Sequence, residues 1–320
     1  MNVGFVIGKF MPPHRGHQQL IDFARTWVDR LYIVVESVKG EPIPSTLRYN
    51  WMCQLFPDCI VLHLKTHQPQ SPDETPDFWN KWQKTLQNIL PEPIHTVFAS
   101  EDYGLPLSKI LNAQFIPVDT ARDSIPISAT KIRNHPAKHW HYIPSCVQQF
   151  YRKKISIFGP ESTGKTTLSK NLALHFDGTW VPEYARCYLE TKGGEIEPSD
   201  MLNIARGQSI IENITQNDAK PILFCDTDPR VTNIWSQYLF NSRSNEIDLI
   251  AQNHHYDLTI VLDVDVPFVD DSIRYIPERR ESFFSSCITM LEKLDAPYLI
   301  VQGSWEERWL KAVQAIQNHT

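Results

Sequence analysis

The run FGPESTGKTT, which begins at Phe158, has the composition and spacing of a phosphate-binding loop. It matches the pattern G-x-x-x-x-G-K-[ST] and lies between an apolar run and a segment of helical periodicity. The glycines let backbone N–H groups surround phosphate oxygens, the lysine adds positive charge, and the threonine hydroxyl ligates Mg²⁺. The pattern predicts a nucleotide site formed by Gly159, Glu161, Ser162, Thr163, Gly164, Lys165, Thr166 and Thr167. The alternative is a glycine-rich turn with a solvated lysine.

Two carboxylates follow the apolar run that starts at Pro221. The letters FCDTD place Asp226 and Asp228 at the carboxyl end of a predicted strand, where parallel sheets bind ligands. Either carboxylate can hold Mg²⁺ or orient an acceptor hydroxyl for in-line attack on a phosphate. We favour Asp226 for the position near the acceptor and, together with Thr166, for the metal. The alternative for Asp228 is the capping of a helix before Pro229.

The segment VPEYAR supplies a carboxylate, an aromatic face and a cation within four positions of one another, in Glu183, Tyr184 and Arg186. These groups can bind a small polar ring that carries a ribose. A surface loop with an i,i+3 ion pair fits the same letters.

The segment from Pro267 to Phe283 is polar and rich in arginine. Arg274, Arg279 and Arg280 predict a lid that closes over a triphosphate and stabilises charge on the transferring phosphoryl group. A solvated, charged helix is the alternative.

A second set of chemical residues lies near the N-terminus, in GKFMPPHRGHQQLI. His14, Arg15, Gly16 and His17 resemble the HxGH signature of the nucleotidyltransferase superfamily. At a helix start, imidazoles and free N–H groups can contact a triphosphate and the charge that develops at its α-phosphate. A capping pair or a metal-binding pair of histidines is the alternative.

The segment ISATKIR from Ile127 resembles the second signature of that superfamily. Ser128 and Thr130 begin a predicted helix, and Lys131 and Arg133 follow. The resemblance implies that this helix start binds the phosphates of ATP.

The order of these motifs resembles the NadR-type family of bifunctional nicotinamide-mononucleotide adenylyltransferases and ribosylnicotinamide kinases. The likeness extends over essentially the whole chain, from GKFMPPHRGH through SATKIR to EYAR, DTD and FVDDSIR. It implies that the C-terminal half phosphorylates nicotinamide riboside with MgATP, and that the N-terminal half joins the resulting mononucleotide to a second ATP, giving NAD and pyrophosphate. Some members carry an additional helix-turn-helix that represses transcription. This chain begins at once with a predicted transferase strand, so DNA binding is not implied.

The resemblance also implies roles for individual residues. The transferase motifs assign ATP binding to Gly8, Lys9, His14, Gly16, His17, Ser128, Thr130 and Arg133. The kinase motifs assign ATP binding to the phosphate loop with Arg274 and Arg279, and riboside binding to Glu183, Tyr184, Asp226 and Asp228. The expected catalytic residues are His14, His17, Arg133, Lys165 and Asp226. Trp79, Trp82 and Trp140 are candidates for ring stacking, with helix packing as the alternative.

The elements that must position these residues alternate along the chain. Short β-branched runs begin at residues 3, 31, 59, 95 and 113, and a second series begins at 154, 221, 256 and 297. Helical patterns such as HQQLIDFARTWV and DFWNKWQKTLQNIL separate the runs. This alternation predicts an α/β fold with two doubly wound parallel sheets. We expect a Rossmann-like nucleotidyltransferase domain over residues 1–150 and a P-loop kinase domain over 151–320.

Composition limits the functional classes. The chain of 320 residues has a formal net charge of −6, which argues against a protein that coats nucleic acid. No signal peptide or membrane-spanning run is predicted, and six scattered cysteines favour reduced thiols in the cytoplasm. His135, His139 and His141 lack the spacing of a metal site. The expected partners are small molecules, with a homo-oligomer as a further option.

Two alternatives remain at the level of function. The P-loop half can be a sensor that binds ATP or NAD without turnover, or the two halves can act on another vitamin or sugar phosphate. No motif decides between the amide and the acid form of the pyridine.

Overall fold

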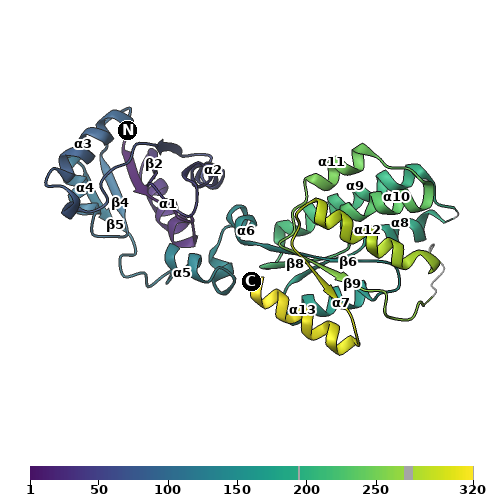
Figure 1. Cartoon of the computed structure of the whole chain (residues 1–320). Coiled ribbons are helices and arrows are strands. Elements are labelled where there is room, and N and C mark those ends of the chain that lie inside the picture. Colours follow the sequence, from purple (N-terminus) through teal and green to yellow (C-terminus); the bar gives the residue numbers. More distant parts are fainter. Residues whose placement is uncertain (194, 270–276, 320) are drawn as a thin grey trace. The chain divides into compact units, whose positions relative to one another are not determined.

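The computed structural model describes residues 1–193, 195–269 and 277–319. It divides into two compact units, Met1–Phe150 and Tyr151–Thr320, which we describe separately (Figure 1). None of the helices in the described residues is long and apolar enough to cross a membrane.

Unit 1 is built on a five-stranded parallel sheet with the order β3-β2-β1-β4-β5. Its strands are β1 (Val3–Gly8), β2 (Arg30–Glu36), β3 (Ile60–Leu64), β4 (Thr96–Ala99) and β5 (Gln114–Pro117). Its helices are α1 (Arg15–Trp27), α2 (Ser45–Leu55), α3 (Phe78–Ile89), α4 (Gly104–Ile110), α5 (Ala129–Asn134) and α6 (Ser145–Tyr151), with 3₁₀ turns at Pro72–Glu74 and Ala137–Tyr142. Strand β1 pairs with β2 on one side and with β4 on the other. The direction of winding therefore reverses at β1, and ligands bind beside the carboxyl ends of strands at such a point.

Helices cover both faces of this sheet because successive side chains of a strand point to opposite faces. Phe5 and Ile7 of β1 pack with Trp82 and Leu86 of α3, whereas Val6 packs with helices α1 and α2 on the other face (Figure 1). The strands are therefore apolar on both sides.

Unit 2 contains a second five-stranded parallel sheet, with the order β10-β9-β6-β8-β7. Its strands are β6 (Lys153–Phe158), β7 (Thr179–Val181), β8 (Ile222–Asp226), β9 (Leu258–Leu262) and β10 (Tyr298–Val301). Its helices are α7 (Lys165–His175), α8 (Tyr184–Lys192), α9 (Pro198–Thr215), α10 (Thr232–Phe240), α11 (Asn245–Gln252), α12 (Arg280–Lys293) and α13 (Trp305–His319), with 3₁₀ turns at Gln216–Asp218, Pro229–Val231 and Pro277–Arg279.

The core of unit 2 also has two layers. Helices α7 and α13 pack on one face of the sheet, and α10 and α12 pack on the other (Figure 1). Strand β6 lies between β8 and β9, so the winding reverses there. The predicted α/β fold with two parallel sheets is confirmed, and every apolar run expected to be a strand is one.

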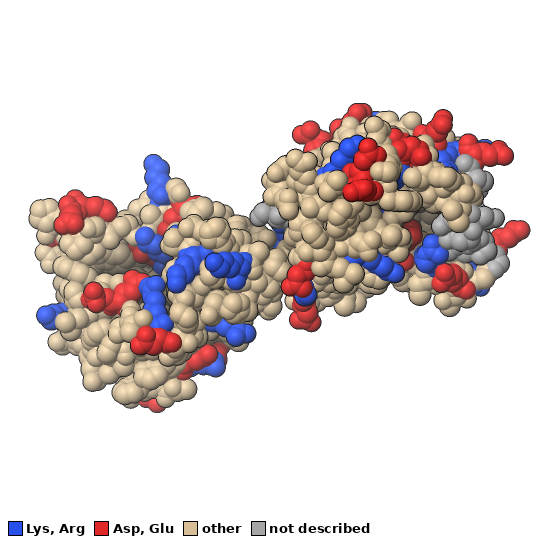
Figure 2. Space-filling model, turned by 90° about the horizontal axis from the view of Figure 1, so that it is seen from below, with Lys and Arg blue, Asp and Glu red and all other residues tan. Residues whose placement is uncertain are grey.

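Charged side chains are distributed without a large area of one sign on the face shown in Figure 2. On each unit, Lys and Arg lie among Asp and Glu, as a formal net charge of −6 with 31 basic and 37 acidic residues leads one to expect.

Candidate active sites

The first candidate site begins at the N-terminus of α1. His14 is the N-cap residue, and its Nδ1 accepts a hydrogen bond from the backbone N–H of His17 at 3.4 Å. The Nδ1 of His17 accepts from the backbone N–H of His14 at 3.3 Å, so the two imidazoles form a reciprocal capping box. The rings stack with centroids 3.7 Å apart. The two histidines therefore form the capping pair that was the alternative interpretation. Because only Nδ1 of each ring takes part in the capping, Nε2 of each ring can contact a ligand.

Both histidines are neutral near pH 7. Burial, with the charge of Arg122, lowers the pKa of His14 to about 4. Burial, with His14 and Arg122 nearby, holds the pKa of His17 well below its usual range. Because each Nδ1 accepts a backbone hydrogen bond, the proton of each neutral ring is on Nε2. The site therefore presents two N–H donors without an added positive charge.

The second signature lies beside the first. Ser128 caps α5 by accepting from the backbone N–H of Lys131 at 3.3 Å. Arg133 donates to the carbonyl oxygen of Met11, 122 positions away, and to the hydroxyl of Thr130 at 3.1 Å. This guanidinium brings the turn after β1 and the start of α5 together.

Two neighbouring clefts meet at His17. One is lined by Gly8, Lys9, His17, Thr130 and Arg133, with Glu36, Tyr103 and the aromatic side chains of α3. The other is lined by His14, Gly16, His17, Ser128 and Thr130, with Glu101, Asp119 and Arg122. The residues predicted for the transferase site therefore lie together around the carboxyl ends of β1 and β4. Sequence reasoning missed Glu36, Tyr103 and Arg122, which stand outside any motif.

Arg48 is a further residue that no motif indicated. It is fully buried and donates to the carbonyl oxygens of Lys9, Glu36 and Ile43, the last at 3.1 Å. Its guanidinium also pairs with Glu41. Arg48 thereby fixes the ends of β1 and β2 beside the cleft.

The phosphate loop of unit 2, residues 159–167, joins β6 to α7. Gly159 has a φ of 131° and Gly164 a φ of 86°, a region that favours glycine. A Cβ on Gly159 would lie 2.8 Å from the carbonyl oxygen of Leu262, and one on Gly164 would lie 2.6 Å from the ring of Trp305. Only glycine fits at either position. The left-handed residue at Gly164 immediately precedes α7, so the free N–H groups of the helix face the loop.

Two buried arginines from the C-terminal part of the chain anchor this loop. Arg308 of α13 is 1% exposed and donates to the carbonyl oxygens of Thr163 at 3.2 Å and Asp263 at 3.1 Å. Arg280, at the start of α12, donates to the carbonyl oxygens of Val266 at 3.1 Å and Ser162 at 3.4 Å. Arg280 was expected in a lid, but these contacts attach it to the loop. Arg279 is exposed, and Arg274 lies outside the described residues.

Asp226 is the last residue of β8 and is 1% exposed. Neither of its carboxylate oxygens has a well-formed hydrogen bond within the described part of the chain. Burial and the charge of Glu183 raise its pKa to about 6, against smaller opposite effects of Thr166, Lys165 and Arg186. An unsatisfied buried carboxylate beside the loop threonine has the donor chemistry that Mg²⁺ requires.

Asp228 has different surroundings. It caps the 3₁₀ turn at Pro229–Val231 by accepting from the backbone N–H of Arg230 at 2.8 Å, as its alternative interpretation expected. It also pairs with the Arg230 guanidinium at 2.7 Å and accepts from Ser156. Burial alone would raise its pKa, but Arg230 and Ser156 hold the pKa of this carboxyl below its ordinary value. These contacts occupy both oxygens, although Asp228 also lines the cavity described below.

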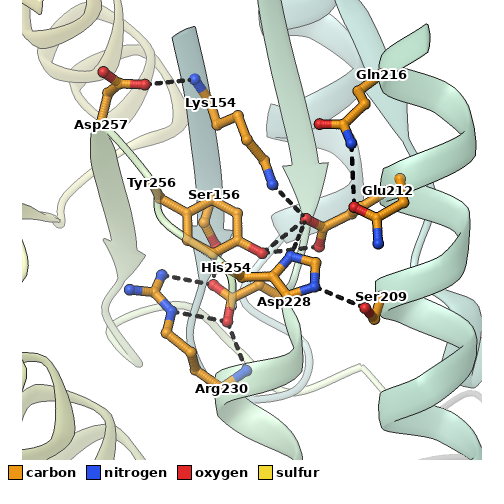
Figure 3. Close-up of polar contacts among 11 residues, drawn as sticks. Lys154, Ser156, Ser209, Glu212, Gln216, Asp228, Arg230, His254, Tyr256 and Asp257 are labelled. Carbon is orange, nitrogen blue, oxygen red and sulfur yellow. Dashed lines mark hydrogen bonds and ion pairs between the residues drawn. The ribbon is translucent and has the colours of Figure 1, made fainter. Parts of the chain in front are cut away.

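Figure 3 shows that the Asp228–Arg230 pair belongs to a larger buried network. Glu212 of α9 is fully buried and accepts from Lys154 at 3.0 Å and from the Tyr256 hydroxyl at 2.9 Å. The Arg230 guanidinium lies 4.4 Å from the centroid of the Tyr256 ring. Two buried anions are thus each paired with a cation, which a low-dielectric interior requires. The network ties α9 to the sheet.

A cavity lies between the phosphate loop, α8, α9 and α10. Its lining includes Glu183, Arg186, Gln208 and Trp235. The backbone N–H of Tyr184 donates to Oε1 of Gln208 at 2.8 Å, which fixes the start of α8 against α9. The ring of Tyr184 packs on Gly207, and in the described residues it is not part of the cavity lining. Of the predicted riboside residues, Glu183 and Asp228 line this cavity.

The tryptophans predicted to stack on a ligand ring lie in two different parts of unit 1. Trp79 and Trp82 line the first cleft of unit 1, and Trp82 donates its indole N–H to the carbonyl oxygen of Pro69 at 3.1 Å. Trp140 is half-buried, and its carbonyl oxygen accepts from Gln148. Among the described residues, no group of three His, Cys, Asp or Glu side chains forms a metal site, and this includes His135, His139 and His141.

Residues 154–308 match a family model described as an AAA domain. The trifunctional NAD biosynthesis/regulator protein NadR of Escherichia coli K12 is 27% identical, over 98% of this chain and 82% of that protein. The Salmonella typhimurium LT2 protein of the same name is 26% identical, over 99% of this chain and 83% of that protein.

Two solved structures are similar over both units. They are crystal structures of a NadR protein, one in complex with NR and one with NAD and AMP-PNP. Each is 24% identical to this chain, covers 100% of it and 96% of the other chain, and gives a TM-score of 0.76. This likeness shows the fold.

Proposed function

Because this chain is a NadR-type protein, we propose that it is a bifunctional enzyme of NAD biosynthesis. Residues 151–320 transfer the γ-phosphoryl group of MgATP to the 5′-hydroxyl of nicotinamide riboside, giving nicotinamide mononucleotide. Residues 1–150 then transfer the adenylyl group of a second ATP to that phosphate, giving NAD and pyrophosphate. The names of the curated relatives, and the NR, NAD and AMP-PNP bound by the similar structures, support this proposal.

In the adenylyl transfer, an oxygen of the mononucleotide phosphate attacks the α-phosphate of ATP. Nε2–H donors of His14 and His17 and the free N–H groups at the start of α1 stabilise the charge that develops there. Lys9 and Arg133 line the adjoining cleft and supply positive charge for the incoming phosphate. Alignment and electrostatics suffice, and no covalent enzyme intermediate is formed.

In the phosphoryl transfer, the backbone N–H groups of the phosphate loop and Lys165 hold the β- and γ-phosphates. Glu183, Thr166, Lys165 and Arg186 all act electrostatically on Asp226, and all four line the cavity next to the phosphate loop. The Asp226 carboxylate accepts the hydrogen bond of the 5′-hydroxyl and aligns it for attack. Thr166 and Asp226 would hold Mg²⁺, and the ion would supply charge neutralisation at the phosphates.

The observation that carries the proposal is a separate helix start, with free backbone N–H groups, at the carboxyl edge of each parallel sheet. The capping box of His14 and His17 forms one, and the phosphate loop with Gly164 forms the other. Two such sites in one chain fit two successive reactions of phosphate groups.

The test is incubation of the purified chain with nicotinamide riboside, ATP and Mg²⁺, followed by chromatography of the mononucleotide and NAD. Lys165→Ala is expected to form NAD only from supplied mononucleotide, and His17→Ala is expected to stop at the mononucleotide. Lys170→Ala on the same helix α7, and His135→Ala at an exposed position, are the matched controls.

A wild-type chain that forms NAD from the mononucleotide but never consumes the riboside would refute the kinase assignment. Unit 2 would then be a nucleotide sensor or a kinase for another acceptor.

A further inference from the structure

A buried carboxylate and several aromatic side chains line the first cleft of unit 1. Glu36 is the last residue of β2, is 6% exposed, and lines this cleft together with Trp79 and Trp82. The side-chain amide of Gln70 donates to its Oε1. No residue in the described ranges donates a hydrogen bond to its Oε2 or forms an ion pair with it. Glu36 therefore keeps acceptor capacity and negative charge for a ligand.

One cation near Glu36, Arg48, is already engaged by another carboxylate. Arg48 donates to the backbone carbonyl of Glu36 at 3.0 Å, but its ion pair is with the Glu41 carboxylate. The fixed position of the Glu36 backbone and the hydrogen bond from Gln70 hold the carboxylate in the cleft. Burial raises the pKa of this carboxyl, and the hydrogen bond from Gln70 and the charges of Lys9 and Arg48 oppose that rise. A charge that is positioned in this way discriminates between ligands of different charge.

The cleft combines two chemically different groups of residues. Lys9, Thr130 and Arg133 supply positive charge and a hydroxyl, which suit a phosphate. Phe78, Trp79 and Trp82 supply ring surfaces, and the only N–H of the Trp82 indole is already used by Pro69. The aromatic residues therefore offer flat apolar faces to a ligand, and Glu36 supplies a carboxylate in the same cleft.

An N-ribosylated pyridine ring is complementary to these residues. The ring carries a fixed positive charge, which aromatic faces and a carboxylate both attract. The amide form also carries an N–H₂ group that can donate to a carboxylate oxygen, whereas the acid form carries a carboxylate that Glu36 repels.

We propose that Glu36 is the specificity-determining residue of this cleft, which attracts the amide form of a pyridine mononucleotide and repels the acid form. This inference rests on the adenylyl transfer proposed for unit 1 and names the residue that selects its substrate. Gln70 is a positioning residue, because it acts on the ligand through Glu36.

The experiment compares wild type with Glu36→Gln, which removes the charge and keeps the shape of the side chain. Dissociation constants for nicotinamide mononucleotide and nicotinic acid mononucleotide are measured by calorimetry. Steady-state kinetics give kcat and KM for dinucleotide formation from each mononucleotide. We expect the acid-to-amide ratio of dissociation constants to fall at least about tenfold, while the KM for ATP stays within about twofold of wild type. Glu92→Gln, which removes a carboxylate bonded to Arg30 at the opposite end of β2, is the matched control and leaves the ratio unchanged.

A second variant protects the test against a folding defect. Glu36→Asp keeps the charge and is expected to keep the amide preference, with weaker binding of both ligands. An unchanged ratio in Glu36→Gln, or a preference lost equally in the Asp and Gln variants, would overturn the inference. If wild type binds the mononucleotides but forms no dinucleotide, the proposed function fails, and the binding ratio still decides the role of Glu36.

Discussion

At the scale of single residues, the two histidines of the capping box are held neutral by burial. The pKa of His14 is about 4 in the folded chain against 6.5 in an exposed one. Below pH 6.5 the unfolded chain therefore binds a proton that the folded chain does not bind until about pH 4. The stabilising contribution is present above pH 6.5 and is lost as the pH falls toward 4.

This difference predicts a pH-dependent loss of stability. Between pH 6.5 and pH 4, wild type should lose about 3 kcal/mol more than His14→Asn, in which asparagine keeps an N-cap but does not titrate. Denaturant unfolding of both proteins across this range measures the loss. Parallel pH profiles of the two proteins would contradict the assignment.

For Asp226 we predict that one substitution raises the stability of the chain and lowers its kinase activity. The Asp226 pKa of about 6 is above the ordinary value because the buried charge is unpaired, so its stabilising contribution is present at low pH and is lost as the pH rises through 6. At pH 8, Asp226→Asn should be more stable than wild type by about 1–3 kcal/mol. Phosphorylation of the riboside should fall at least about 100-fold, because the carboxylate is lost. Denaturant unfolding and a kinase assay test both parts, and a less stable Asn variant at pH 8 would exclude an unpaired charge.

At the scale of elements, the acceptor cavity depends on how α8 packs on α9. A Cβ at Gly207 would lie 2.0 Å from the ring of Tyr184. Gly207→Ala should therefore push the start of α8 away from α9, at a cost of about 1–3 kcal/mol in the stability of unit 2.

The displacement moves Glu183, which lines the cavity next to Tyr184. We expect the KM for the riboside to rise about tenfold or more, with little change in the KM for ATP, since the phosphate loop is anchored separately by Arg308. Steady-state kinetics with each substrate varied in turn measure both constants. Equal rises in the two KM values would show that the effect is not confined to the acceptor side.

At the scale of the whole molecule, each unit has its own sheet, core and proposed phosphate-binding site. A mixture of Lys165→Ala and His17→Ala should therefore form NAD from the riboside, although neither variant does so alone. A lag is expected while the mononucleotide accumulates in solution. Chromatography of the mixture over time tests this, and an absence of NAD would mean that the two reactions require both sites in one chain.

The sequence alone predicted the fold class, which the structure confirms, and the two helix starts that we propose bind phosphate. The phosphate loop, HxGH and ISATKIR are local motifs, because consecutive backbone N–H groups at a helix start bind phosphate, and nearby letters specify a helix start. The apolar runs predicted the strands for a similar reason, since alternation and burial are visible within a few residues. The assignment of one activity to each half stays a prediction.

Only the tertiary structure decided which residues complete these sites. Arg308 reaches the phosphate loop across 145 positions, and Arg133 reaches Met11 across 122. The two carboxylates of DTD belong to one pattern in the sequence, yet among the described residues Asp228 is paired with Arg230 while Asp226 has no such partner. Glu36 becomes a candidate for substrate selection only because α3 places Trp79 and Trp82 in the same cleft. Such contacts depend on strand register and helix packing, which bring together residues whose local sequences carry no common signal.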